Sequence, residues 1–90
     1  MRIEVFSSWD EMMGQLLAER TDFAIFETAG SRHLYWSDYN YSESVRKAFP
    51  YHKILDHGDY FTTSIISLTI TDIMEKVISA VLADLDKVSF

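Results

Sequence analysis

The sequence predicts a single α+β domain spanning residues 1–90. Two hydrophobic spacings lead to this prediction. Residues 66–70 alternate apolar with small polar side chains, the period of a β-strand with one buried face. Residues 73–88 place apolar side chains every three or four positions, the period of an amphipathic helix. A chain of 90 residues buries one modest hydrophobic core, which suits one domain.

The first elements are predicted to be a strand and a helix. Ile3 and Val5 suit a short strand because polar residues flank them on the alternate side. The segment Ser8-Trp9-Asp10-Glu11 is a capping box, in which the Ser8 hydroxyl accepts a hydrogen bond from the Glu11 N–H at the start of a helix. The apolar positions of this helix are predicted to form one buried stripe: Trp9, Met13, Leu16 and Leu17.

The middle of the chain is predicted to form an antiparallel hairpin and a short helix. The continuous apolar run 23–26 is typical of a central strand. A turn at 29–31 then leads into the aromatic segment 32–41 as its antiparallel partner. Residues 42–49 can form a short helix, which Pro50 ends because the residue before a proline avoids helical geometry.

The last part is predicted to contain a loop through 57–59, a strand over 60–70 and a helix capped by Thr71 or Asp72. The resulting order is β-α-β-β-α-β-α. A ferredoxin-like plait with an extra C-terminal helix satisfies this order. If residues 42–55 are irregular instead, a three-layer or open-sheet arrangement becomes possible.

Composition excludes several classes of function. Eight basic and 14 acidic residues give a net charge of −6, so we expect neither direct nucleic-acid binding nor attraction to an anionic membrane surface. Without cysteine there is no disulfide, thiol nucleophile or thiolate metal site. Residues 1–4 carry charge where a signal peptide needs apolar residues, and no apolar run approaches membrane-spanning length. We therefore expect a cytoplasmic protein.

Catalytic and cofactor motifs are missing from the sequence. The three glycines stand far apart, so there is no phosphate-binding loop, and no serine lies in a Gly-x-Ser-x-Gly turn. His52, Asp56, His57 and Asp59 would form a small His/Asp enzyme site only if they converged in one cleft. Their spacing matches no established metal site. We expect no catalytic residue, metal or cofactor.

The segment RHLYWSDYNYSE, residues 32–43, is the main candidate site. On a strand, Leu34 and Trp36 share one face and suit the core. The other face carries His33 and three tyrosines at alternate positions, and tyrosine is common in binding hot spots. We expect the segment to be an extended edge whose tyrosine-bearing side is accessible, and the predicted partner-binding residues are His33, Tyr35, Asp38, Tyr39 and Tyr41. The alternative is a sheet face that the terminal helix covers, with the tyrosines filling space.

The leading functional hypothesis is a non-enzymatic, acidic interaction module that binds a protein partner with a basic surface and inhibits or regulates it. Immunity proteins, antitoxins and phage-borne inhibitors fit this description. The first alternative is a dimeric regulatory domain that binds a small molecule, as ACT-like domains do; the second is the His/Asp enzyme. The last helix could supply a homodimer interface through heptad-like spacing: Met74, Ile78, Val81, Leu85 and Val88.

Overall fold

The computed structural model describes residues 1–37, 43–55 and 61–86. Within these ranges the elements are, in chain order, β1 (Ile3–Phe6), α1 (Trp9–Leu17), β2 (Phe23–Thr28), β3 (Ser31–Ser37), α2 (Glu43–Ala48), β4 (His52–Ile54), β5 (Phe61–Ile66) and α3 (Ile70–Asp86). The chain is thus a small compact α+β structure, as the sequence predicts. No helix in the described ranges is long and apolar enough to cross a membrane.

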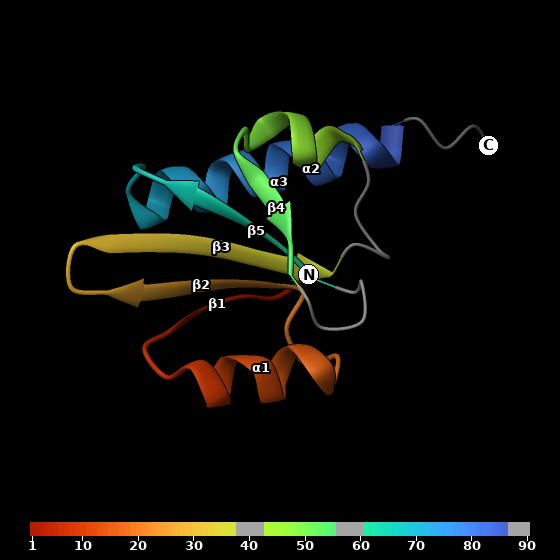
Figure 1. Cartoon of the computed structure of the whole chain (residues 1–90). Helices are drawn as coiled ribbons and strands as arrows, with labels where there is room; N and C mark the ends of the chain where they lie inside the picture. Colours follow the sequence, from red (N-terminus) through yellow and green to blue (C-terminus); the bar gives the residue numbers. More distant parts are fainter. Residues whose placement is uncertain (38–42, 56–60, 87–90) are drawn as a thin grey trace.

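The strands form one mixed sheet in the order β1-β2-β3-β5-β4. β1 and β2 are parallel, and every other neighbouring pair is antiparallel. Because parallel strands need a crossover, α1 lies between β1 and β2 in sequence and packs on one face of the sheet. Helices α2 and α3 cover the opposite face, which makes three layers (Figure 1).

The predicted ferredoxin-like order is not confirmed. The sequence indicated one strand after the middle helix, whereas the structure has both β4 and β5 there, paired antiparallel to each other. Strands β3 and β4 both run antiparallel to β5, so they are parallel to each other with β5 between them, and the departure from the predicted order is the extra strand after α2. β4 escaped notice because its three residues are all exposed and show no alternation of apolar and polar side chains.

Two hydrophobic clusters pack against the two faces of the sheet. The cluster beneath α2 and α3 consists of Phe23, Ile25, Leu34, Trp36, Val45, Phe49, Ile73, Val77 and Ala80. The cluster beneath α1 consists of Phe6, Met12, Met13, Leu16, Ala24, Tyr35 and Phe61. Strand β3 contributes to both clusters because successive side chains point to opposite faces. The prediction that Leu34 and Trp36 belong to the core is confirmed.

The two long helices begin with hydrogen-bonded caps. In α1 the Glu11 N–H donates to Ser8 Oγ at 3.3 Å, which confirms the predicted cap. In α3 the cap is Thr69, which accepts from the Asp72 N–H at 3.1 Å and donates to Asp72 Oδ2 at 2.7 Å. The expectation that Thr71 or Asp72 caps this helix is wrong, because the strand before it ends at Ile66 and leaves Thr69 outside the helix.

The buried stripe of α1 is also rotated from the predicted one. Met12, Met13 and Leu16 are buried, whereas Leu17 is 63% exposed. Leu17 is the last residue of the helix. Leu17 is therefore a surface residue in this fold.

Candidate functional site

The aromatic segment after the β2–β3 turn lies in the middle of the sheet. Strand β3 pairs with β2 on one side and with β5 on the other, so it is not the extended edge that the sequence led us to expect. Tyr35 is only 7% exposed and belongs to the core beneath α1. Its prediction as an accessible anchor is wrong, because Trp9 of α1 packs edge-on against its ring with centroids 5.3 Å apart.

His33 is the other described member of the predicted site. It points to the same face as Tyr35, is half-buried, and stacks on the Tyr35 ring at a centroid distance of 6.4 Å. The remaining predicted members, Asp38, Tyr39 and Tyr41, lie outside the described residues. The structure therefore brings His33 and Tyr35 together.

A row of four side chains crosses the α1 face from β1 to β5. The strand register places Phe6 beside Phe26, Phe26 beside His33, and His33 beside Ile65. We call these four residues the cross-strand row. Their exposure rises along it: Phe6 is 6% exposed, Phe26 and His33 are half-buried, and Ile65 is 64% exposed. The row thus passes from the core beneath α1 to the open surface.

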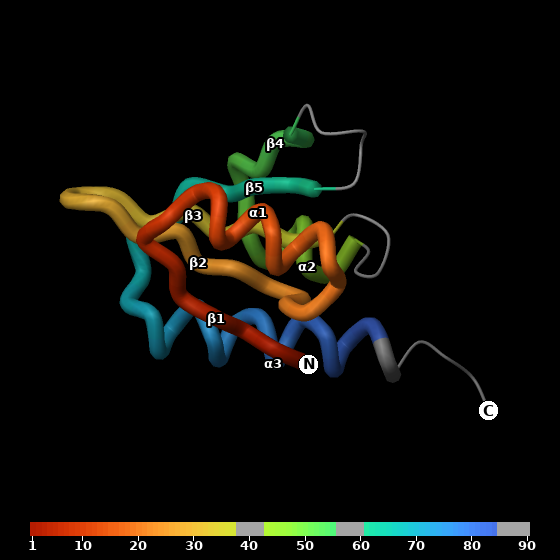
Figure 2. The backbone as a smooth tube through the Cα atoms, turned by 90° about the horizontal axis from the view of Figure 1, so that it is seen from below, coloured from red at the N-terminus to blue at the C-terminus, as the bar shows by residue number. Residues whose placement is uncertain are grey.

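The position of α1 explains this gradient. Residues of α1 share one cluster with β1, β2 and the middle of β3, and β4 lies to one side of the helix (Figure 2). No helix in the described part of the chain covers Ile65. Aliphatic side chains this exposed on a sheet face are candidates for contact with another molecule.

Trp9 extends the cross-strand row onto the helix. Its ring stands perpendicular to Phe26, at a centroid distance of 5.7 Å, and to Tyr35. Edge-to-face contacts of this kind stabilise aromatic clusters beyond the area that they bury. Asp10 and Glu11 follow in the exposed first turn of α1, where their carboxylates complement the helix dipole. The surface therefore combines rings with an acidic margin.

Sequence reasoning missed Trp9, Phe26 and Ile65 as parts of this surface. The capping box placed Trp9 in the first turn of α1, but nothing local shows which strands that turn contacts. Ile65 belongs to a run of apolar and small polar residues, so its exposure depends on where the covering helix ends. The strand register joins Phe26 and Ile65 to His33, and ring contacts with Phe26 and Tyr35 join Trp9 to the same surface.

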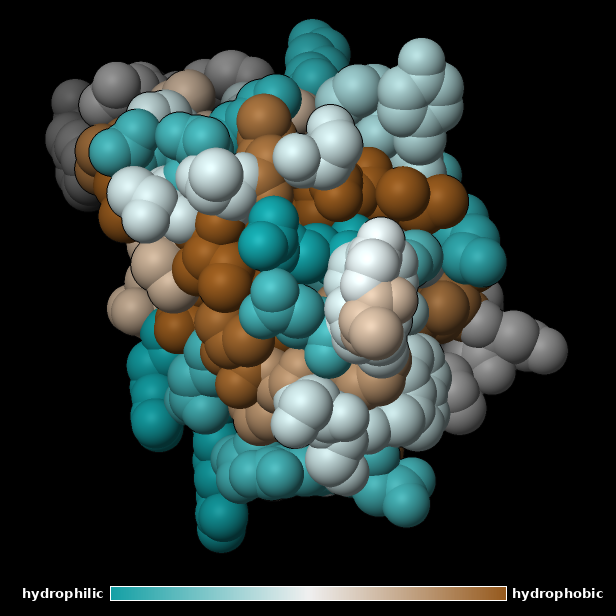
Figure 3. Space-filling view, turned by 90° about the vertical axis from the view of Figure 1, so that its left-hand side faces the viewer, coloured by the Kyte–Doolittle hydropathy of each residue, from teal (hydrophilic) through white to brown (hydrophobic). Residues whose placement is uncertain are grey.

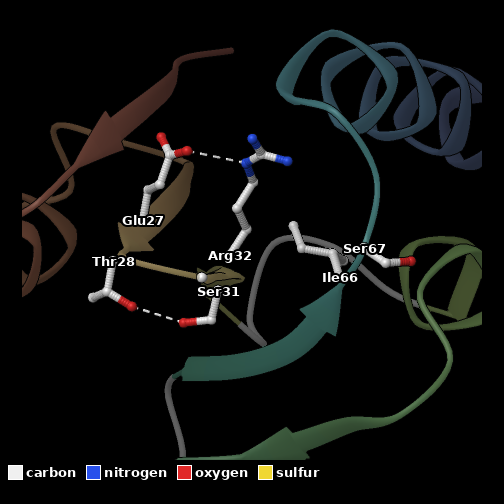
Figure 4. A pocket seen from close by; sticks show the side chains of 7 residues that line it. Glu27, Thr28, Ser31, Arg32, Ile66 and Ser67 are labelled. Atoms are coloured by element: carbon white, nitrogen blue, oxygen red, sulfur yellow. Dashed lines mark hydrogen bonds and ion pairs between the residues drawn. The ribbon is translucent and has the colours of Figure 1, made fainter.

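A polar depression of about 400 Å³ lies at the β2–β3 turn (Figure 4). Arg32 reaches across it, with Nε 3.1 Å from Glu27 Oε1 and with Nη1 donating to the Leu68 carbonyl at 2.9 Å. The Thr28 and Ser31 hydroxyls are hydrogen-bonded to each other at 2.7 Å. Because Glu27 offsets the charge of Arg32, the depression offers polar groups with little net charge.

The histidine cluster is only partly described. His52 lies on exposed strand β4, with its ring centroid 6.3 Å from that of Trp36. Asp56, His57 and Asp59 lie outside the described residues. Among those that are described, no group of three or more His, Asp and Glu side chains could hold a metal ion.

The described members of the predicted heptad-like seam, Met74, Ile78 and Val81, lie outside the buried face of α3. Ile73, Val77 and Ala80 face the sheet, whereas Ile78 is 43% and Leu82 is 55% exposed. Met74 and Val81 are half-buried between these two faces. Two members of the predicted seam, Leu85 and Val88, have no described side chain.

The surface at the β2–β3 turn end carries apolar side chains between hydrophilic ones (Figure 3). Together the sheet and its helices define a small three-layer α+β domain with a mixed five-stranded sheet. Comparisons with protein-family models, with curated proteins and with solved structures find no match.

Proposed function

We propose that this chain is a non-enzymatic interaction module that binds a protein partner and thereby inhibits or regulates it. The observation that carries the proposal is the cross-strand row, in which exposure rises from Phe6 to Ile65 beside the half-buried Trp9. Half-covered rings next to an exposed aliphatic side chain lose little conformational entropy on binding and exclude water well. Such surfaces are typical of binding hot spots.

The charge of the chain supports a partner with a basic surface. Asp10 and Glu11 flank Trp9, and the whole chain carries a net charge of −6. Opposite charge on the partner would raise the association rate more than the affinity. Immunity proteins, antitoxins and phage-borne inhibitors are classes that fit this description. The same proposal retains the cytoplasmic location that the sequence predicts.

The residues after β3 are a separate part of the proposed surface. Asp38, Tyr39 and Tyr41 follow Ser37, at the opposite end of the strand from His33. A strand rises roughly 3.3 Å per residue, so the two ends of β3 are distinct positions on the protein. The contribution of these three residues is best tested independently of the cross-strand row.

The test compares two exposed aliphatic residues of equal accessibility. Ile65 is 64% and Leu17 is 63% exposed, but only Ile65 belongs to the cross-strand row. Immobilised wild type, Ile65→Glu and Leu17→Glu would be used to capture proteins from the source cells, after circular dichroism has shown equal folding. A captured protein would then be purified and titrated against all three chains.

The proposal expects one stoichiometric partner that binds wild type and Leu17→Glu alike and binds Ile65→Glu at least roughly tenfold more weakly. That partner's own activity should fall or change when the wild-type chain is added. Equal affinity for Ile65→Glu, or loss of binding only with Leu17→Glu, would reject the cross-strand row as the binding surface.

The second candidate is a dimeric regulatory domain that binds a small molecule. Two observations favour it: the polar depression around Arg32, and the exposed side chains of Ile78 and Leu82 about one helical turn apart on α3. Thermal shift against a metabolite library should then raise the melting temperature with ligand concentration, and Arg32→Ala should abolish the rise. Sedimentation velocity should show a dimer that Ile78→Lys dissociates. A chain that stays monomeric at its highest soluble concentration would remove this candidate.

A further inference from the structure

Strand β4 forms one edge of the sheet and is exposed along its whole length. Its only strand neighbour is β5 in the part of the chain that the structure describes. An edge strand presents backbone N–H and C=O groups that another extended segment can pair with.

The hydrogen bonds beside β4 show which backbone groups face outward. The Leu55 N–H donates to the Phe61 carbonyl at 2.8 Å, so Leu55 turns its backbone toward β5. In an antiparallel pair this orientation alternates, so Lys53 also faces β5 while His52 and Ile54 face away from it. The N–H and C=O groups of His52 and Ile54 are therefore the ones that an added strand would use.

The surroundings of this edge are basic although the chain as a whole is acidic. Residues 43–56 contain three Lys and Arg residues, Arg46, Lys47 and Lys53, and two acidic residues at the ends of the range, Glu43 and Asp56, within a chain whose net charge is −6. Lys53 and Lys47 are exposed. Lys76 of α3 approaches this corner from the α3 face of the sheet, where its Nζ lies 5.4 Å from the centre of the Phe49 ring, whereas Lys53 points to the α1 face because its neighbour His52 contacts Trp36. Lys53 thus places a positive charge in β4 itself, and Lys76 adds one on the other face of the sheet.

Ring contacts connect Lys76 to the edge strand. Phe49 packs against Trp36 with centroids 6.4 Å apart, and Trp36 packs against His52 at 6.3 Å. These contacts place the helix lysine and the outward-facing backbone of His52 around one buried pair of rings. The corner is therefore held by the core and does not depend on a loop.

Apolar surface lies at both ends of β4. Ile54 is 57% exposed, and Tyr51, immediately before the strand, is 85% exposed. Tyr51 has a φ of 69°, a left-handed conformation that is unfavourable for an aromatic residue. The Ser64 hydroxyl donates to the Pro50 carbonyl at 3.0 Å and fixes the chain just before this residue. The Tyr51 backbone is strained and its ring is exposed, so this residue adds little to the core. Such a residue is more typical of a recognition site than of a structural position.

We propose that β4 is a docking edge for an extended acidic peptide segment of a partner protein, which adds to the sheet as a further strand. The outward backbone groups of His52 and Ile54 would form the ladder, and Lys53 with its basic neighbours would select acidic side chains. A second copy of the chain fits less well, because antiparallel pairing of two β4 strands would bring two basic corners together. This proposal does not rest on the cross-strand row, which lies on β1, β2, β3 and β5 and has an acidic margin.

The probe is a blocked, fluorescein-labelled peptide of roughly nine residues in which glutamate and valine alternate, a length typical of a strand. The matched control peptide has lysine in place of every glutamate. In fluorescence anisotropy the glutamate peptide should saturate with a Kd below about 1 mM at low salt, and the affinity should fall as salt is added. Hydrogen exchange should slow at the amides of His52 and Ile54 and stay unchanged at Lys53, whose amide already faces β5.

Two pairs of variants separate the backbone from the charge. Ile54→Pro removes an outward N–H without affecting the β4–β5 ladder, since proline is tolerated where the N–H faces away from the sheet, whereas Ile54→Thr keeps that N–H. Lys53→Glu reverses the local charge, and Arg20→Glu makes the same change in net charge after α1. Ile54→Pro and Lys53→Glu should each weaken the glutamate peptide roughly tenfold, and the two control variants by less than about twofold.

Several results would overturn the proposal. The lysine peptide could bind as tightly as the glutamate peptide, Ile54→Pro and Lys53→Glu could leave the affinity unchanged, or no saturation could be reached below about 1 mM. Slower exchange at His52 and Ile54 with rising protein concentration, in the absence of peptide, would mean that a second copy occupies the edge. Each of these results leaves the Ile65 experiment unaffected, so the two proposals fail independently.

Discussion

His33 on β3 lies directly opposite Ile65 on β5, and this pair marks where the cover provided by α1 ends. His33 is half-buried and stacked on Tyr35, whereas Ile65 is largely exposed. Substitutions at positions that α1 covers should therefore change the free energy of unfolding. Substitutions beyond this boundary should change the affinity for the proposed partner. The predictions below concern the stability of the folded chain.

Truncation should destabilise the chain strongly at Tyr35 and hardly at all at Tyr51. Tyr35 is buried against Trp9, so Tyr35→Ala should lower the free energy of unfolding by about 3 kcal/mol through lost burial and a cavity. Tyr51 is exposed, so Tyr51→Ala should change it by less than about 0.5 kcal/mol. Urea denaturation followed by tryptophan fluorescence measures both. Similar values for the two variants would contradict the burial of Tyr35.

The glycines at 14 and 30 should give changes of opposite sign when replaced by alanine. Gly14 lies inside α1, and a Cβ added there would meet no other atom. Gly14→Ala should therefore stabilise the chain by about 0.5–1 kcal/mol. Gly30 has a φ of 90°, which strains any residue with a Cβ, so Gly30→Ala should destabilise it by about 1 kcal/mol. Thermal and urea unfolding of both variants under one set of conditions would show the difference in sign.

Thr69 and Thr71 distinguish two possible starts of α3. Thr69→Ala removes the hydroxyl that accepts from the Asp72 N–H, and should cost about 1 kcal/mol of unfolding free energy. Thr71 is exposed within the first turn, so Thr71→Ala should have an effect below about 0.5 kcal/mol. If Thr71→Ala lowered the unfolding free energy more than Thr69→Ala, the helix would begin after Ile70.

The Arg32–Glu27 pair should contribute little through its charges. Both side chains are about one-third exposed, at 35% and 37%, so a double-mutant cycle with Glu27→Gln and Arg32→Ala should give a coupling below about 1 kcal/mol that falls with added salt. Arg32→Ala should cost more than Glu27→Gln, because it also leaves the Leu68 carbonyl without its donor. A coupling energy that does not change with salt would contradict this prediction. Equal losses of unfolding free energy for Glu27→Gln and Arg32→Ala would contradict it as well.

Local sequence patterns located the three helices and the central strands but not all of their bounds: the strand predicted over 60–70 ends at Ile66, and α3 begins at Ile70. The capping box located Ser8 because a cap depends on residues three positions apart, and Leu34 and Trp36 were placed in the core because a strand alternates faces. Strand β4 was missed because it is held in the sheet by its pairing with β5. Its own three residues show no strand pattern.

The amino-acid sequence by itself determined the α+β class, the acidic charge and the division of β3 into two faces, since each depends on composition or short-range spacing. Only the tertiary structure decided which side chains on the α1 face remain accessible: α1 covers Tyr35 and leaves Ile65 open. The reason is that exposure depends on where a helix remote in sequence comes to rest. No local sequence pattern shows where that helix will pack on the sheet.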